Sequence, residues 1–251
     1  MDTMIRAAIG YGFRAIGFSE HSYAPLQSSY CMPPEKTDDY FREIREARER
    51  YKGKIRVFGG FELDKDSELP DDRPDYIIAS VHELMCGDIN YPVDWSESIQ
   101  RELAEVKYGG DMFSVWQEYY GEVVRHVERS RPDIIGHFDL ITKYSLVDES
   151  DPDYMELAAG AAVRCMETCD TFELNTGAIA RHLRTVPYPA DFILRKIKEK
   201  GGRVIITSDC HFPDRMTCWF SEAEDYLGAL GFRQDPHADL NEKVKDIEIW
   251  Y

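Results

Sequence analysis

Several features of membrane and secreted proteins are missing from this sequence of 251 residues. Its apolar runs, such as Val204-Ile205-Ile206, are far shorter than the ~20 residues that a membrane-spanning helix needs. No basic and then apolar leader opens the sequence, so no secretory signal is expected. The six cysteines include no Cys-x-x-Cys pair and lie among apolar residues, which disfavours a structural zinc cluster and disulfides. We therefore expect a cytoplasmic protein with reduced cysteines.

Basic residues are scarce relative to acidic ones. The sequence contains 30 Lys and Arg residues and 47 Asp and Glu residues, which gives a formal net charge of −17. A field of that sign repels phosphate backbones, and no basic patch stands out along the chain. Nucleic acid and membrane surfaces are therefore not expected as partners, whereas metal cations and cationic small molecules are favoured.

Three common catalytic motifs are also missing. The sequence contains no Gly-x-Ser-x-Gly turn, no phosphate-binding Gly-x-x-x-x-Gly-Lys-Ser/Thr loop and no His-Glu-x-x-His pair. Cys210, between Asp209 and His211, would be the candidate thiol nucleophile. In an extended Asp-Cys-His segment, however, the middle side chain points away from the two outer ones, so we expect Cys210 to face away from any site.

Short β-branched runs alternate with longer amphipathic stretches along the whole chain. The predicted strands span residues 15–19, 55–63, 76–82, 134–138, 172–175 and 204–208. The helices between them are predicted to begin near Thr37, at a capping box from Asp94 to Glu97, at Asp111, at Asp151 and at Ser221. Strands that alternate with helices predict parallel pairing with helices outside the sheet. No linker or repeat divides the chain, so residues 1–251 are predicted to form a single α/β domain.

Ionisable side chains gather where the predicted strands end. Two acids and four of the seven histidines are at or just beyond strand ends: His21, Glu62, His82, His137, Asp209 and His211. The carboxyl ends of parallel strands lie on one face of the sheet, so these side chains are expected to converge there. One such histidine alone is more often structural, but the set would otherwise leave many ionisable groups without partners. His126 and His237 are expected to face solvent.

This group of ligand types predicts a metal site. Imidazoles combined with carboxylates suit Zn, Mn or Fe, and a carboxylate that bridges two ions suits a site with several metals. A divalent-metal site, with more than one ion if a carboxylate bridges, is therefore expected. Such a site activates water directly, so no separate protein nucleophile is required.

The ordered motifs resemble the PHP family, named for polymerase and histidinol phosphatase. The resemblance rests on Glu-His at His21, the strand-end Glu62, Ser-Val-His at His82, Gly-His-Phe-Asp-Leu at His137 and Ser-Asp-x-His at Asp209 and His211. The stretch from Glu173 to Pro189, with the sequence ELNTGAIARHLRTVPYP, is similar to the histidinol-phosphatase branch. Each motif alone is weak, but the ordered set spans essentially the whole chain.

The resemblance implies a distorted TIM-like barrel of seven βα units with a trinuclear metal site at the strand carboxyl ends, and so one to three divalent ions per chain. Glu62 would bridge two metals, and His82 and His137 would complete the shell of the second. Asp209 would bind the first metal, while His21 and His211 would bind the third. Arg181 falls where this branch places an arginine on the substrate phosphate, a task that suits a guanidinium fork.

One part of the family pattern is missing. The family opens with a strand that carries His-x-His, whereas residues 1–18 here already match the helix and strand that follow it. We therefore expect an open barrel of six family strands, with the edge of strand 15–19 unpaired. Collapse, a chain terminus or a second copy of the chain would cover the gap, the last making a homodimer.

The resemblance predicts a metal-dependent phosphate monoester hydrolase with a phosphorylated small molecule as substrate. L-Histidinol phosphate, in histidine biosynthesis, is the expected substrate, with a metal-activated water as the nucleophile. Two alternatives stay open on the sequence. One is a PHP-type phosphoesterase with another substrate, and the other is a truncated metal-binding remnant with little activity.

Overall fold

Six parallel strands form the centre of the fold in the computed structural model, which describes residues 1–27, 30–68, 71, 73–146 and 148–251. They are β1 (Ala15–His21), β2 (Arg56–Leu63), β3 (Ile77–Ala79), β6 (Ile134–Ile135), β7 (Thr171–Asn175) and β8 (Arg203–Thr207). Every strand overlaps one of the six predicted ranges, and two of them, β3 and β6, are shorter than predicted. Each pairs in parallel with the next in this order. The predicted parallel α/β architecture is therefore confirmed.

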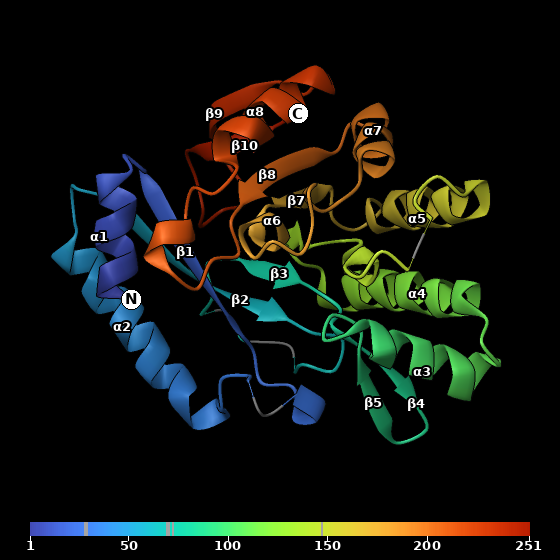
Figure 1. The fold of residues 1–251 in the computed structure, drawn as a ribbon. Helices are drawn as coiled ribbons and strands as arrows, with labels where there is room; N and C mark the ends of the chain where they lie inside the picture. The colour runs from blue at the N-terminus through green and yellow to red at the C-terminus, as the bar shows by residue number, and fades with distance from the viewer. Residues whose placement is uncertain (28–29, 69–70, 72, 147) are drawn as a thin grey trace.

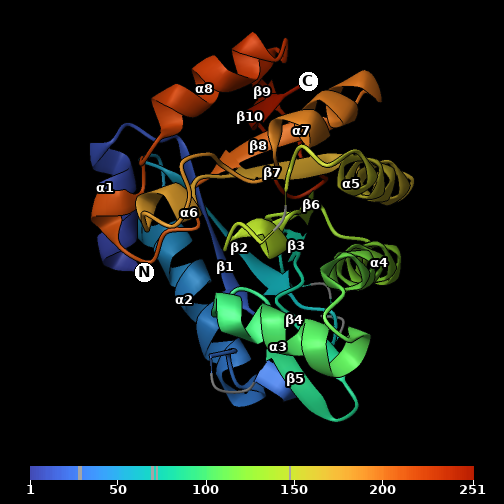
Figure 2. The same cartoon turned by 45° about the vertical axis from the view of Figure 1, so that its right-hand side comes forward.

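Helices lie outside this curled sheet, as expected for strands joined by crossovers. Figures 1 and 2 show α3, α4 and α5 side by side along one flank and α1 and α2 along another. The eight helices of the described residues are α1 (Asp2–Gly10), α2 (Thr37–Arg50), α3 (Glu97–Tyr108), α4 (Met112–Ser130), α5 (Pro152–Cys165), α6 (Gly177–Ala180), α7 (Asp191–Glu199) and α8 (Phe220–Ala229). Short 3₁₀ turns span Pro25–Gln27, Pro34–Lys36, Leu140–Thr142 and Pro213–Arg215.

Three of the five predicted helix starts, at Thr37, Asp111 and Asp151, are correct, and two are wrong. Asp111 caps α4 and Asp151 caps α5, each by accepting hydrogen bonds from backbone N–H groups. The start of α3 is at Ser96, whose hydroxyl accepts from the N–H of Ile99, and not at Asp94. Asp94 instead forms an ion pair with Lys143. Ser221 lies inside the first turn of α8, because that helix already begins at Phe220.

Four strands were not predicted from the sequence. β4 (Glu83–Cys86) and β5 (Ile89–Pro92) form an antiparallel hairpin beside α3. β9 (Gln234–Ala238) and β10 (Ile247–Trp250) extend the main sheet in antiparallel fashion, in the order β1-β2-β3-β6-β7-β8-β10-β9. β9 is almost entirely polar, and β10, although Ile247, Glu248 and Ile249 alternate, has only four residues, so their pairing depends on the sheet edge that they join.

The main sheet is an open, distorted barrel. Residues before Ala15 form α1 and a turn, so β1 stands at one edge of the sheet, as expected. β10 covers the far side of β8, although a single residue pair, Trp250 with Val204, joins them. A cavity of about 700 Å³ reaches into the barrel and is lined by residues of both β1 and β8. Covering of the β1 edge by a second copy of the chain stays a prediction.

The helices are held by apolar faces that pack on the sheet. The largest buried cluster includes Tyr119, Tyr120 and Tyr154 from α4 and α5 together with Phe138 and Phe172. His126 on α4 also lies in this layer at 2% exposure, so the prediction that it faces solvent is wrong. His237 is exposed, as predicted. Within the described residues, no helix is long and apolar enough to cross a bilayer.

Candidate metal centre

The parallel register of β1 and β2 places the first two predicted ligands side by side. His21 and Glu62 are the last paired residues of these neighbouring strands. His82 follows β3 and His137 follows β6, so both side chains reach the same end of the sheet. The rings pack edge to face, with centroids 5.1 Å apart for His21 and His82 and 4.8 Å apart for His82 and His137. The structure therefore brings together four of the six predicted ligands.

Glu62 lies at the centre of this group, and its two oxygens face different histidines. Oε2 is 3.6 Å from Nε2 of His21. Oε1 is 3.5 Å from Nε2 of His82 and 3.1 Å from Nε2 of His137. Because its two oxygens face different histidines, Glu62 would be able to bind divalent ions through either oxygen.

Asp64 was not singled out in the sequence, yet it holds one of these imidazoles. Its Oδ2 atom is 2.6 Å from Nδ1 of His82 and also accepts the backbone N–H of His82 at 3.1 Å. Asp64 is 2% exposed. Its position two residues after Glu62 puts it on the same face of the extended chain, and this period of two is the signal that could have identified it.

Within this group, the pKa of His82 is raised and the pKa of Glu62 is lowered. Burial opposes protonation of His82, but the hydrogen bond and charge of Asp64 and the charge of Glu62 raise its pKa to about 10. Burial likewise disfavours ionised Glu62, but the charge of His21 and the hydrogen bond with His137 hold its pKa well below the usual range. The site therefore stabilises an ionised carboxylate among imidazoles.

These residues fit a divalent metal. His21, Glu62 and His82 each offer a ligand atom, and the three atoms lie within 4.8 Å of one another. The contact of His82 with Asp64 is the outer-shell arrangement that orients metal-binding histidines. Nδ1 of His137 is buried and has no hydrogen-bond partner among the described residues, so this ring also has a nitrogen available to a ligand. Imidazole and carboxylate donors suit Zn, Mn or Fe.

The remaining predicted residues lie on the β7 and β8 side of the same opening. Arg181 follows α6, and its Nη2 atom is 3.1 Å from Oδ2 of Asp209. Asp209 has a left-handed backbone, with φ of 44°. His211 is exposed and lines the same cavity, but within the described residues no ion pair or ring contact joins it to Glu62. Asp209 and His211 thus line the same cavity as His21, Glu62 and His137.

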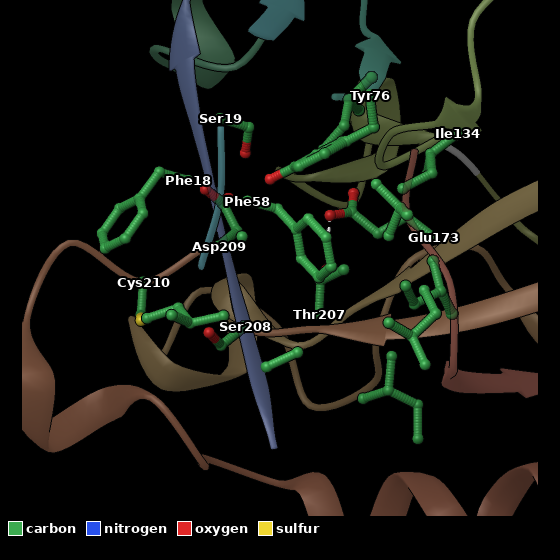
Figure 3. A pocket seen from close by; sticks show the side chains of 18 of the residues that line it. Phe18, Ser19, Phe58, Tyr76, Ile134, Glu173, Thr207, Ser208, Asp209 and Cys210 are labelled. Atoms are coloured by element: carbon green, nitrogen blue, oxygen red, sulfur yellow. Dashed lines mark hydrogen bonds between the residues drawn. The ribbon is translucent and has the colours of Figure 1, made fainter. Parts of the chain in front are cut away.

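Cys210 is not placed as a nucleophile. Its side chain packs against the apolar cluster that includes Met216. Figure 3 shows its sulfur on the opposite side of the segment from Glu173. Burial raises the pKa of the Cys210 thiol, so the reactive thiolate is disfavoured. Cys210 also lines the cavity that Glu62 and Asp209 line, so the prediction that it points away from any site stays a prediction.

A second acid that was not assigned a role lies deeper in the barrel. Glu173 on β7 is 4% exposed and accepts hydrogen bonds from the backbone N–H of His137, Nδ2 of Asn175 and the hydroxyl of Thr207. Figure 3 shows it at the cavity near Tyr76. Burial raises its pKa, although the charge of His137 acts in the opposite direction.

Comparison with known proteins agrees with this geometry. The PHP domain model matches residues 1–177. A curated relative from Schizosaccharomyces pombe, named as a probable histidinol-phosphatase, is 25% identical over 92% of this chain and 81% of its own. The histidinol-phosphatase of Bacillus subtilis is 24% identical over 81% of this chain and 84% of its own.

Two solved structures share the fold. A candidate histidinol phosphatase from Listeria monocytogenes has a TM-score of 0.75 at 18% identity, over 88% of this chain and 92% of its own. Histidinol phosphate phosphatase from Lactococcus lactis, in complex with zinc, L-histidinol and phosphate, has a TM-score of 0.64 at 20% identity. That alignment covers 92% of this chain and 88% of the other. Because the PHP domain model matches more than half of the sequence, the chain belongs to the PHP domain family.

Proposed function

We propose that this protein is a metal-dependent phosphate monoester hydrolase that acts on L-histidinol phosphate in histidine biosynthesis. The observation that carries this proposal is the group of three histidines around Glu62 at the strand carboxyl ends. The relatives from Schizosaccharomyces pombe and Bacillus subtilis are named as histidinol-phosphatases, and the similarity to this chain covers most of the length of each. The six free cysteines support a cytoplasmic location, where thiols stay reduced.

The proposed metal ligands are His21, Glu62, His82, His137, Asp209 and His211. When bound, divalent ions stabilise negative charge on the phosphoryl oxygens and lower the pKa of water. Glu62 keeps its charge among the three imidazoles and so supplies an oxygen to each side of the group. Asp64 fixes the ring of His82, because its hydrogen bond at Nδ1 leaves Nε2 facing Glu62.

Arg181 is the proposed phosphate-binding residue. Its guanidinium is about one-third exposed and opens toward Asp209, on the same side of the barrel as the predicted metal ligands. A guanidinium can donate two parallel hydrogen bonds to a phosphate. Arg184 cannot share this role, because its buried side chain is bonded to Thr142 and Glu149.

The test is phosphate release from L-histidinol phosphate by the purified protein with added Mn or Zn. Glu62→Ala is the matched variant, because Glu62 contacts all three histidines. We expect phosphate release from the wild type and its loss in the variant. Equal rates for the two proteins would contradict the proposal.

Metal content distinguishes a working enzyme from the alternative, a metal-binding remnant with little activity. Elemental analysis that finds two or three ions per chain, together with phosphate release, supports a working enzyme. About one ion per chain without turnover would support the remnant instead. A panel of other phosphate monoesters, assayed in parallel, tests the substrate independently of the reaction.

A further inference from the structure

Glu173 is connected to three segments that carry site residues. Its Oε2 atom accepts the backbone N–H of His137 at 2.7 Å and Nδ2 of Asn175 at 3.0 Å. Its Oε1 atom accepts the hydroxyl of Thr207. The three donors belong to the loop after β6, to the end of β7 and to the end of β8. One buried carboxylate therefore joins three neighbouring strands.

Each of these donors leads directly to a residue of the proposed site. His137 is itself a predicted metal ligand. Thr207 is the last residue of β8, two positions before Asp209. Asn175 accepts the N–H of Gly177 at 2.8 Å with its Oδ1 atom, and Gly177 begins the short helix α6 that ends just before Arg181.

The start of α6 has little freedom to move. A Cβ atom added to Gly177 would lie 2.9 Å from the carbonyl oxygen of Ser208 and 3.1 Å from Nη2 of Arg181. The backbone N–H and the hydroxyl of Thr176 both donate to the carbonyl oxygen of Thr207. The position of α6 relative to the end of β8 thus depends on close packing and on the hydrogen bonds of Glu173 with Asn175 and Thr207.

We propose that Glu173 is a positioning residue that holds the segments of His137, Asp209 and Arg181 in one fixed arrangement, so that metal ions and phosphate bind together. This inference rests on the proposed function. The hydrogen bonds of Glu173 go to the backbone of His137 and to Asn175 and Thr207, and not to the side chain of a predicted ligand, so it acts through these three groups.

Two substitutions of Glu173 separate the effect of its hydrogen bonds from the effect of its negative charge. In Glu173→Gln, the amide oxygen can accept from His137 and Asn175, while the amide nitrogen donates to the Thr207 hydroxyl, which can accept as well as donate. The variant therefore keeps all three bonds without the negative charge. Glu173→Ala removes all three and leaves a buried N–H of His137 without its acceptor.

The experiment measures binding rather than turnover. Wild type, Glu173→Gln and Glu173→Ala are titrated with Zn against a chromophoric chelator, and with inorganic phosphate after metal loading. We expect Glu173→Gln to match the wild type. Glu173→Ala should lose affinity for both probes by about 10-fold or more, the size of effect seen for groups that orient metal ligands.

Asp133→Ala is the control for a merely structural effect. Asp133 precedes β6 at the opposite end of the strand and accepts hydrogen bonds from Ile77 and Asn241. This variant should lower the melting temperature while both affinities stay unchanged. If Glu173→Ala lost no more affinity than Asp133→Ala, or if Glu173→Gln were as defective as Glu173→Ala, the proposal would be overturned.

Asn175→Ala tests the same connection if Glu173→Ala does not fold. It breaks the bond to Gly177 but leaves the bond between Glu173 and His137, so phosphate affinity should fall more than Zn affinity. Equal losses of the two affinities, or none, would contradict the proposed connection. The proposed function fails separately, if wild type binds Zn and phosphate yet releases no phosphate from L-histidinol phosphate.

Discussion

Asp64 holds His82 at one ring nitrogen while the other nitrogen faces Glu62. Oδ2 of Asp64 is 2.6 Å from Nδ1 of His82, and Nε2 of His82 is 3.5 Å from Oε1 of Glu62. The hydrogen bond selects the tautomer and orientation that present Nε2 to a metal. Asp64 thus orients one of the proposed metal ligands without being proposed as a ligand itself.

Asp64→Asn should weaken metal binding. A neutral amide is a weaker acceptor for Nδ1–H than a carboxylate, so we expect Zn affinity to fall by about 10- to 100-fold. Competition with a chromophoric chelator measures this change. Asp66→Asn is the control, because Asp66 lies in the same loop but accepts from the N–H of Leu26. An equal loss in both variants would show that the loop, and not the contact with His82, determines affinity.

Arg181→Ala should damage substrate capture more than metal binding. Loss of a charge-assisted contact that leaves phosphate unpaired costs about 2–4 kcal/mol in transition-state binding. The expected result is a large fall in kcat/KM with metal content intact. Arg195→Ala is a suitable control, since Arg195 pairs with Asp191 on the exposed face of α7. Unchanged kcat/KM in Arg181→Ala would remove this residue from the site.

His126 should make stability depend on pH in mildly acidic solution. Burial and the charge of Arg129 lower its pKa below the usual value of about 6.5, and its Nε2–H donates to the carbonyl oxygen of Leu63. The unfolded chain then binds a proton that the folded chain does not, so the free energy of unfolding falls as pH drops below about 6.5.

The variant that tests this effect is His126→Gln, whose amide can still donate to Leu63. Denaturant unfolding at several pH values should show a shallower decrease than in wild type, by at most about 1.4 kcal/mol per pH unit. A wild-type slope in His126→Gln would show that His126 is not responsible.

Two glycine substitutions should have opposite effects. A Cβ atom on Gly136 would lie 2.5 Å from Oγ of Ser80 and 2.8 Å from Cγ2 of Ile78, so Gly136→Ala should push the His137 segment off β3. We expect lower stability and weaker Zn binding. Gly160 lies in α5 with open space around its Cα, so Gly160→Ala should stabilise the fold by about 1 kcal/mol with Zn affinity unchanged. Thermal unfolding and chelator competition measure both effects, and unaltered Zn binding in Gly136→Ala would contradict this account of Gly136.

The sequence alone determined the six parallel strands and the end of the sheet at which the site lies. Apolar runs and their alternation with helices are local properties, and parallel strands bring their carboxyl ends to one edge whatever the details of packing. This is why the sequence is sufficient to place His21, Glu62, His82 and His137 together. The same reasoning located Asp209 and His211 at this edge, whereas Arg181 was expected there only from the family resemblance, and the roles of all three stay predictions.

Only the tertiary structure decided which partner each buried polar group finds. The contact of Asp64 with His82, the burial of His126 against Leu63 and the bond from His137 to Glu173 all join residues from different elements. The strands β9 and β10 likewise depend on the sheet edge that they extend, and Asp94 binds Lys143 instead of capping α3. Local patterns encode periodicity and direction along the chain. Partners that are dozens of residues apart are fixed by packing and desolvation, which act only once the elements have met.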